Sequence, residues 1–308
     1  MSASRILIGH DGSPHADDAL ALGRVLSELT GGELILARVV PWEPLALQAV
    51  PVPELKRRYE EEERAALAEL QRVADEAGAG AEAGPGESPS QGLQWLAEEL
   101  EADIVVVGSS HRGRVGQVLA GNVALRLLNG LDRPLAVAPA GYAENVGDVR
   151  TIGVGFDATP ESRAALRTAG ELAQVANAKV RVLGIAEPHT QLVAHPWAFG
   201  WQAGTDTKRY YARVRGELES AARRLPRGVV RSAEFHIGGA AAILADHAQW
   251  VDLLVLGSRG YGPVRRVLLG SVSSELVRGA ACPVLVVPRP AAQGPEEHLA
   301  TVEGAARA

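Results

Sequence analysis

Short apolar runs alternate with longer segments of helical periodicity along the chain. Residues 104–108 read Ile-Val-Val-Val-Gly and residues 253–257 read Leu-Leu-Val-Leu-Gly, so neither run alternates between apolar and polar positions. Such runs predict strands buried on both faces, because a strand with one face in water shows that alternation. Strands that alternate with helices predict a parallel sheet with helices on both of its faces. We therefore expect an α/β fold.

The same pattern occurs twice in the chain. Residues 6–14 align with residues 152–160, and residues 102–139 align without a gap with residues 251–288. Each copy predicts five strands and four helices. The expected architecture is two tandem Rossmann-like domains, each with a five-stranded parallel sheet and four flanking helices.

The expected elements fall at matching places in the two copies. The strands of the first copy are expected at residues 5–9, 34–40, 79–84, 104–108 and 135–138. The strands of the second copy are expected at residues 151–155, 180–186, 229–237, 253–257 and 284–287. Helices are expected at residues 15–29, 53–77, 89–100, 122–128, 161–176, 205–225, 240–249 and 271–278. The run at 79–84 has the weakest strand signal, because it is rich in Gly and Ala and is bounded by Pro85 and Pro89.

A polar stretch at residues 140–148 separates the two copies. We place the first domain at residues 1–146 and the second at residues 147–290. Residues 291–308 have no periodic pattern and are expected to form a flexible tail.

Composition excludes several classes of protein. Of the 308 residues, 46% are hydrophobic and 22% are charged, which is typical of a folded globular chain and not of a disordered or fibrous one. The net charge is −6 with no basic block, so no nucleic acid or anionic membrane partner is expected. No apolar run approaches the length of about 18 residues that a membrane span needs. A cytoplasmic location is expected, and the single cysteine, Cys282, is expected to be buried and unreactive.

A glycine pattern follows the fourth strand of the second copy. From Gly257 to Ser271 the sequence has the form G-x2-G-x9-G-S and leads into a helix. Glycine lets backbone N–H groups approach phosphate oxygens closely, and the first N–H groups of a helix add a positive dipole end. Ser271 is expected at the N-cap, where its hydroxyl can cap the helix or contact a phosphate. The alternative is that the glycines only form a tight turn from strand to helix.

Asp157 stands at the end of the first strand of the second copy. In a doubly wound sheet the C-terminal ends of the strands meet at the binding crevice, so Asp157 is expected opposite the glycine loop. A carboxylate there can accept hydrogen bonds from a ribose hydroxyl or an adenine amine. The alternative role for Asp157 is to cap the helix that follows.

Three features together resemble one family. They are Asp157-x-Thr159-Pro160, the spacing of Gly257, Gly260, Gly270 and Ser271, and the ending Cys-Pro-Val-Leu-Val-Val-Pro. They are similar to the universal stress protein family in its tandem form, over residues 5–140 and 151–289. The resemblance implies an adenine nucleotide alpha hydrolase-like fold and the binding of ATP, with or without Mg²⁺. Carried onto the second copy, it implies these nucleotide-binding residues: Asp157, Thr159, Ile185, Gly257, Arg259, Gly260, Gly262, Gly270, Ser271, Val272 and Ser273.

The first copy departs from this pattern at two positions. His111 replaces the second glycine and Asn122 replaces the serine. A side chain at 111 would crowd the phosphates, and a positive φ costs more there than at glycine. The site of the first copy is therefore either weakened, or altered so that a protonated His111 contacts phosphate. Its corresponding residues are Asp11, Ser13, Val39, Gly108, Gly113, Gly121 and Asn122.

Other kinds of site have little support. No histidine has a Cys or carboxylate partner at metal-ligand spacing, so no metal site is expected; the histidines considered are His10, His15, His189, His195, His236 and His247. The Walker A pattern is missing and neither glycine loop contains a lysine, so fast phosphoryl transfer is not predicted.

The expected function is therefore that of an ATP-binding regulatory protein of the stress response. Two alternatives stay open: a slow Mg²⁺-dependent ATP hydrolase, and a protein-interaction module that binds no nucleotide. No enzymatic activity beyond a weak ATPase is expected. The resemblance also implies that the final strands, at 134–139 and 283–288, pair the two domains and that the chain forms a homodimer. The expected partners are an adenine nucleotide and an unidentified regulatory protein.

Overall fold

The computed structural model describes residues 4–42, 52–109, 122–186, 203–258 and 270–288. The first copy contains β1 (Arg5–Gly9), α1 (Pro14–Thr30), β2 (Glu33–Pro41), α2 (Val52–Ala77), β3 (Gly80–Gly86), α3 (Pro89–Glu99), β4 (Ile104–Gly108), α4 (Asn122–Leu128) and β5 (Leu135–Ala138). The second copy contains β6 (Thr151–Phe156), α5 (Pro160–Ala176), β7 (Lys179–Ala186), α6 (Ala203–Arg223), β8 (Arg231–Ile237), α7 (Ala240–His247), β9 (Leu253–Gly257), α8 (Ser271–Gly279) and β10 (Val284–Val287). Short 3-10 turns also occur at Tyr142–Glu144 and Ala248–Trp250.

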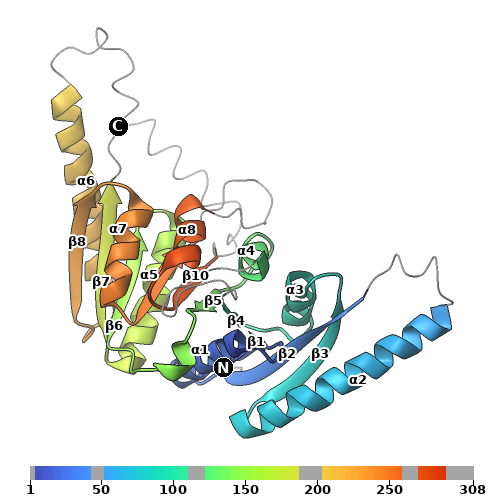
Figure 1. The fold of residues 1–308 in the computed structure, drawn as a ribbon. Helices are drawn as coiled ribbons and strands as arrows, with labels where there is room; N and C mark the ends of the chain where they lie inside the picture. Colours follow the sequence, from blue (N-terminus) through green and yellow to red (C-terminus); the bar gives the residue numbers. More distant parts are fainter. Residues whose placement is uncertain (1–3, 43–51, 110–121, 187–202, 259–269, 289–308) are drawn as a thin grey trace, which may run out of the picture.

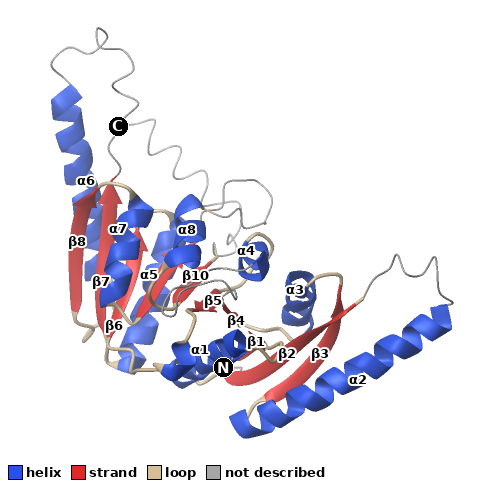
Figure 2. Ribbon diagram, in the orientation of Figure 1, coloured by secondary structure: helices blue, strands red, loops and turns tan. Residues whose placement is uncertain are grey.

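The described strands form one sheet of ten strands, in the order β3-β2-β1-β4-β5-β10-β9-β6-β7-β8 (Figures 1 and 2). All pairs within each copy are parallel, which confirms the expected five-stranded parallel sheets. The two final strands, β5 and β10, pair antiparallel, with Ala136 opposite Leu285. The two halves therefore share a continuous sheet, and β3 and β8 form its two ends.

Helices cover both faces of this sheet, which explains the apolar runs without alternation. Ile6 and Ile8 on β1 pack into the core that contains residues of α1, α2, α5 and α6, whereas Leu7 packs into the core formed with α3, α4, α7 and α8. All three side chains have zero exposure. A polar residue at any of these positions would be buried, so each strand is apolar at successive residues.

Three helices begin with proline behind a Ser or Thr residue. Pro14, Pro89 and Pro160 occupy the first turn, where the missing N–H costs no helical hydrogen bond. Thr159 also accepts a hydrogen bond from the Ser162 N–H at 3.2 Å. These starts hold α1, α3 and α5 directly behind the ends of β1, β3 and β6.

The weakest predicted strand is present as β3. It runs from Gly80 to Gly86, contains Pro85, and pairs in parallel with β2. Proline fits here because β3 ends the sheet, and an edge strand does not need every N–H for pairing. Gly84 packs closely on α3, since a Cβ at this position would lie 2.7 Å from Trp95 and 2.9 Å from Leu96.

The linker between the copies is tied to α1 by a buried carboxylate. Asp18 is 2% exposed, and its two oxygens accept hydrogen bonds from the N–H groups of Gly141 at 2.9 Å and Ala143 at 2.8 Å. The expected domain boundary at residues 146 and 147 falls just beyond this attachment and stays a prediction. The expected tail at 291–308 lies outside the described residues.

Cys282 is 5% exposed, as expected from its apolar neighbours, and burial raises the pKa of its thiol to about 12. Each helix in the described part of the chain is too short or too polar to span a bilayer.

Candidate functional site

The connections reverse direction between two neighbouring strands in each copy. From β6 the chain proceeds outward through β7 and β8, whereas β9 leads to β10 on the other side. In doubly wound sheets the ligand crevice is expected at such a reversal, here at the C-terminal ends of β6 and β9. Val154 on β6 pairs with Val255 on β9. Asp157, just after β6, and Gly257, at the end of β9, are thus placed at the same crevice.

The first copy repeats this arrangement between β1 and β4. Ile8 pairs with Val106, so Asp11 and Gly108 flank the corresponding crevice. Asp11 accepts a hydrogen bond from the Ser13 N–H at 3.0 Å. Ser13 is the N-cap residue of α1, although its side chain makes no capping hydrogen bond.

Asp157 organises the turn that leads into α5. Its Oδ1 accepts hydrogen bonds from the Thr159 N–H at 3.1 Å and from the Thr159 hydroxyl at 2.6 Å. Thr159, not Asp157, is the N-cap of α5. The residue between them, Ala158, has φ of 63°, and the matching residue of the first copy is Gly12 with φ of 81°. A left-handed alanine is a strained conformation of the kind that gathers at functional sites.

Glycine at 257 and 108 is explained by packing. A Cβ at Gly257 would lie 2.6 Å from the carbonyl carbon of Glu161 and 2.7 Å from the backbone nitrogen of Ser162, in the first turn of α5. A Cβ at Gly108 would collide with the carbonyl of His15 in α1. The end of the fourth strand in each copy therefore presses against the start of the first helix. This contact requires glycine whether or not a ligand is present.

The start of α8 differs from the expectation in one respect. Gly270 is the N-cap residue, and Ser271 is the first residue of the helix, so the expected N-cap role of Ser271 is wrong. The backbone geometry decides this, because Gly270 has extended φ and ψ and its carbonyl accepts the Ser274 N–H at 3.0 Å. Ser271 is exposed at the helix N-terminus and Val272 is half-buried beside it.

Ser273 is committed to the protein interior. It is 4% exposed, and its hydroxyl donates to the carbonyl of Gly257 at 3.0 Å. This bond ties the first turn of α8 to the end of β9 and holds the two ends of the glycine loop together. The Ser273 hydroxyl therefore positions the loop, and its expected contact with phosphate stays a prediction.

The hydrophobic members of the expected site lie on the second strand of each copy. Ile185 on β7 and Val39 on β2 are both half-buried and pack on the core of the α3, α4, α7 and α8 face. Several expected residues lie outside the described part of the chain: Arg259, Gly260, Gly262, His111, Gly113 and Gly121. Asn122 begins α4.

Two serines beside the glycine positions were not singled out by the sequence. Ser109 and Ser258 directly follow β4 and β9, are 3% and 2% exposed, and have no hydrogen-bond partner for their hydroxyls among the described residues. Their matching positions in the repeat, directly after Gly108 and Gly257, were the available signal. They place a buried polar group at the start of each glycine loop.

A separate groove of about 930 Å³ lies between α1, the linker and the C-terminal end of α5. Its lining includes Arg24, Glu28, Asp148 and Arg150. None of the expected nucleotide residues lines it, so the crevice and the groove are distinct.

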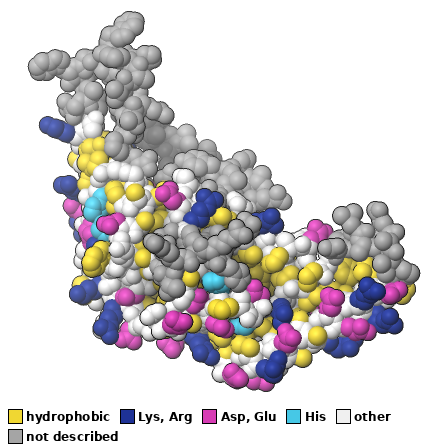
Figure 3. All heavy atoms as spheres, viewed as in Figure 1, with side chains coloured by type: hydrophobic (Ala, Val, Ile, Leu, Met, Phe, Trp, Pro, Cys, Tyr) yellow, Lys and Arg dark blue, Asp and Glu magenta, His cyan; other side chains and the backbone are white. Residues whose placement is uncertain are grey.

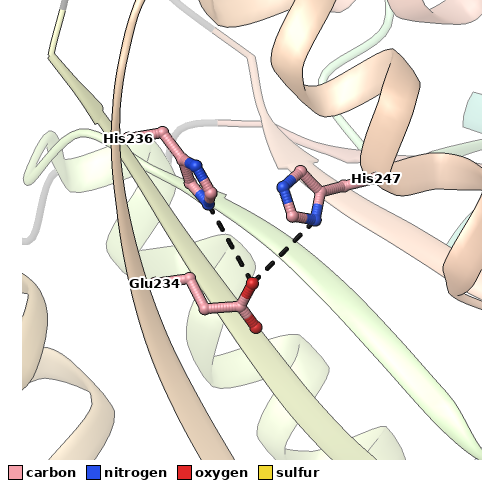
Figure 4. Close-up of side chains that lie close together, drawn as sticks. All are labelled: Glu234, His236 and His247. Atoms are coloured by element: carbon pink, nitrogen blue, oxygen red, sulfur yellow. Dashed lines mark ion pairs between the residues drawn. The ribbon is translucent and has the colours of Figure 1, made fainter.

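The structure corrects the expectation that the histidines lack carboxylate partners. Glu234, His236 and His247 bring their ligand atoms within 4.8 Å of one another (Figure 4). Glu234 and His236 are two residues apart on β8, so both face the same side of the sheet. His247 comes from the end of α7, and only the fold brings it to the strand. The Glu-x-His spacing within a strand was the signal in the sequence.

Arg181 on β7 completes this group of charges. Its Nε and Nη2 donate to the two carboxylate oxygens of Glu234 at 2.9 and 2.8 Å. This pairing holds the pKa of Glu234 down at about 2. Burial lowers the pKa of His247, and the neighbouring Arg181 charge lowers it further.

The model of the universal stress protein family matches residues 3–139 and residues 148–288. A universal stress protein of Mycobacterium tuberculosis is 34% identical over 206 residues, which are 65% of this chain and 69% of that protein. Another, from Mycobacterium bovis, is 28% identical over 297 residues, which are 91% of this chain and 96% of that protein.

A solved structure shares the fold over most of the chain. The crystal structure of a universal stress protein from Archaeoglobus fulgidus has a TM-score of 0.65 at 19% identity, and covers 94% of this chain and 100% of that one. This likeness concerns the fold, whereas the family model matches both sequence copies. Because its two matches together span most of the chain, this protein belongs to the universal stress protein family, in tandem two-domain form.

Proposed function

We propose that this universal stress protein binds ATP in its second domain and acts as a nucleotide-dependent regulatory protein of the stress response. The observation that carries the proposal is the meeting of Asp157 and Gly257 at the point where the strand order reverses. In doubly wound sheets this crevice is the usual binding site. The glycine spacing and the family resemblance favour ATP as its ligand.

The residues present have the chemistry that ATP requires. Asp157 is an exposed acceptor that can receive hydrogen bonds from ribose hydroxyls or the adenine amine. The N–H groups of the first turn of α8 have no partners within the helix, and its dipole places partial positive charge there. Ser271 adds an exposed hydroxyl at the same helix end. When bound, ATP would supply a triphosphate whose negative charge this helix end favours.

We expect one strong site per chain. The first domain keeps Asp11 and Gly108 in the same geometry, but His111 and Asn122 replace the second glycine and the serine. Each replacement removes a feature that the second copy offers to phosphates. ATP binding by the first domain is therefore proposed to be weak in comparison.

Regulation requires that ATP bind two states of the protein with different affinity. We propose that the favoured state is recognised by a regulatory protein partner in the cytoplasm. A homodimer remains part of the proposal, but β5 and β10 already pair with each other in one chain. Two chains must therefore associate through a different surface.

The test compares two aspartates at matching positions. Nucleotide released from the purified protein by acid is identified, and ATP is titrated calorimetrically into the stripped protein with and without Mg²⁺. We expect one ATP per chain, at least about tenfold weaker binding in Asp157→Ala, and little change in Asp11→Ala, since one good hydrogen bond to ligand is worth about 1.4 kcal/mol or more. Circular dichroism of both variants controls for folding.

The alternatives give different results. Two equivalents of ATP per chain would contradict the weak first site. Equal loss in Asp11→Ala and Asp157→Ala would contradict the assignment to the second domain. Phosphate release that needs Mg²⁺ and disappears in Asp157→Ala would identify a slow hydrolase. No binding at millimolar ATP would overturn the proposal and leave a protein-interaction module.

A further inference from the structure

Two histidines and one glutamate converge at the outer end of the sheet, two strands away from the nucleotide crevice. Oε2 of Glu234 lies 4.0 Å from Nε2 of His236 and 4.0 Å from Nδ1 of His247. The two imidazole rings meet edge to face with centroids 4.7 Å apart. Figure 4 shows that the three side chains point toward one another from β8 and α7.

The fold orients each of these groups from a regular element. Glu234 and His236 are two residues apart on β8, so both side chains face α7. Their partners on β7, Leu183 and Ile185, face the same side of the sheet. His247 is the last residue of α7, which packs over this end of the sheet. Ligands held by a strand and a helix have restricted positions, which suits a preformed site.

The three side chains match a known ligand set. Two imidazoles and one carboxylate, with a further position open to water, form a common arrangement around Zn²⁺. Ligand distances of about 2.0–2.2 Å place tetrahedral donor atoms about 3.4 Å apart. The observed separations are 4.0 Å from each imidazole to the carboxylate and within 4.8 Å for the whole group, so side-chain rotations must draw the three groups together to bind an ion. Side-chain exposures of 14–32% leave the group accessible to an ion from solution.

His236 offers an independent indication. Its Nε2 is buried and has no hydrogen-bond partner among the described residues, although it faces the Glu234 carboxylate. A buried nitrogen without a partner costs free energy unless a ligand or water satisfies it. A metal ion between His236 and Glu234 would satisfy this nitrogen.

Arg181 occupies the place that the metal would take. Its Nη2 lies 2.8 Å from Oε2 of Glu234 and 3.0 Å from Nδ1 of His247. The guanidinium therefore uses the same lone pairs that a metal would use. Its side chain is 24% exposed, so it can turn toward solvent. In the space-filling view, histidine, acidic and basic side chains reach the surface together at this edge (Figure 3).

The first domain shows that the fold does not require this cluster. The strand pairing places Glu82 and Gly84 of β3 at the positions that Glu234 and His236 have in β8. Gly84 is buried, and a Cβ there would collide with Trp95 and Leu96 of α3. An apolar contact thus takes the place that His236 has in the second domain. The histidines of the second domain are an addition to a common framework.

From this geometry we propose that Glu234, His236 and His247 form a site for a divalent transition metal, best matched by Zn²⁺, from which Arg181 must be displaced. This site is independent of the proposed ATP site. Arg181 stabilises the metal-free form by supplying the positive charge that Glu234 needs. The bound metal would replace that charge, so the arginine and the metal compete.

The test uses the full chain without a histidine tag, freed of metal by a chelator and then dialysed. ZnCl₂ is titrated calorimetrically in the absence of nucleotide, and Co²⁺ is added separately to record the visible absorption of its coordination. We expect one Zn²⁺ per chain. His236→Ala and His247→Ala should each weaken binding at least about tenfold, because each removes one of three protein ligands.

Two further variants make the result specific. Arg181→Met should bind Zn²⁺ at least about tenfold more tightly than the parent, because the competing cation is gone. Glu82→Gln, at the matching exposed position of the first domain, should leave binding unchanged, whereas Glu234→Gln should weaken it. Thermal unfolding of each metal-free variant shows whether it is folded.

Several outcomes would overturn the proposal. One is no Zn²⁺ binding by either the parent or Arg181→Met, which would make the cluster a purely structural ion-pair network. Another is binding that persists undiminished when both histidines are replaced. Equal losses in Glu82→Gln and Glu234→Gln would also count against it. None of these results depends on whether ATP binds.

Discussion

Replacing Gly257 by alanine separates a packing role from a ligand-binding role. The added methyl group would lie 2.6 Å from the carbonyl carbon of Glu161 and 2.7 Å from the backbone nitrogen of Ser162, whereas ordinary contacts begin at 3.4 Å. The backbone would have to move by about 0.8 Å to relieve the shorter contact. Thr159 caps this helix end and resists that shift. We expect Gly257→Ala to lower the free energy of unfolding by about 1–3 kcal/mol.

A glycine elsewhere in the same domain provides the matched control. Gly216 lies in the exposed middle of α6, where an added Cβ has no neighbour within 4 Å. Gly216→Ala should therefore raise the free energy of unfolding by about 0.5–1 kcal/mol, through the helix propensity of alanine. The same chemical change thus has opposite signs at the two positions.

The assay is urea unfolding of the nucleotide-free protein, followed by far-UV circular dichroism. Measurement without nucleotide is essential, because a bound ligand would add its own stabilisation to the parent. If Gly257→Ala were as stable as the parent and lost only affinity for ATP, the packing argument would be refuted. The glycine would then serve the ligand alone.

Two other features of the structure lead to direct tests. Asp18→Ala leaves the N–H groups of Gly141 and Ala143 without their acceptor, so it should cost about 2–4 kcal/mol in urea unfolding. Glu28→Ala, at an exposed position of the same helix, should change stability by less than about 0.5 kcal/mol, and equal effects would contradict the role of the buried carboxylate. Cys282, with a pKa raised to about 12, should resist iodoacetamide at pH 8 in the native protein and react after unfolding in urea, as measured by mass spectrometry. Rapid native labelling would show that the thiol is not held in the core.

Much of the fold could be predicted from short-range pattern. The apolar runs at β4 and β9 identify strands buried on both faces, and helical periodicity places the segments between them. Repetition then identifies two copies, because the same signals recur in the same order. The position of Asp157 at the end of β6 also follows from local sequence, since it comes directly after the strand. These features depend on residues that are neighbours in the chain.

The reasons for particular residues emerged only from the folded chain. Gly257 resembles a loop glycine in the sequence, yet it is required because α5 starts against the end of β9, almost one hundred residues away in the chain. Asp18 holds a linker 123–125 residues further along. The sequence pattern places Ser271 at the N-cap, whereas in the structure Ser271 is the first residue of α8 and Gly270 is the N-cap. Local composition does not define the exact end of a helix.

The grouping of Glu234, His236 and His247 shows most clearly which features follow from local sequence and which from tertiary packing. The spacing of Glu234 and His236 in a strand determines by itself that they share a face. The arrival of His247 beside β8 depends on how α7 packs on β7, and the placement of Arg181 depends on the register between β7 and β8. Periodicity is a property of neighbouring residues, so the sequence alone determines the elements and their buried faces. Distances between elements depend on tertiary packing, which only the folded chain decides.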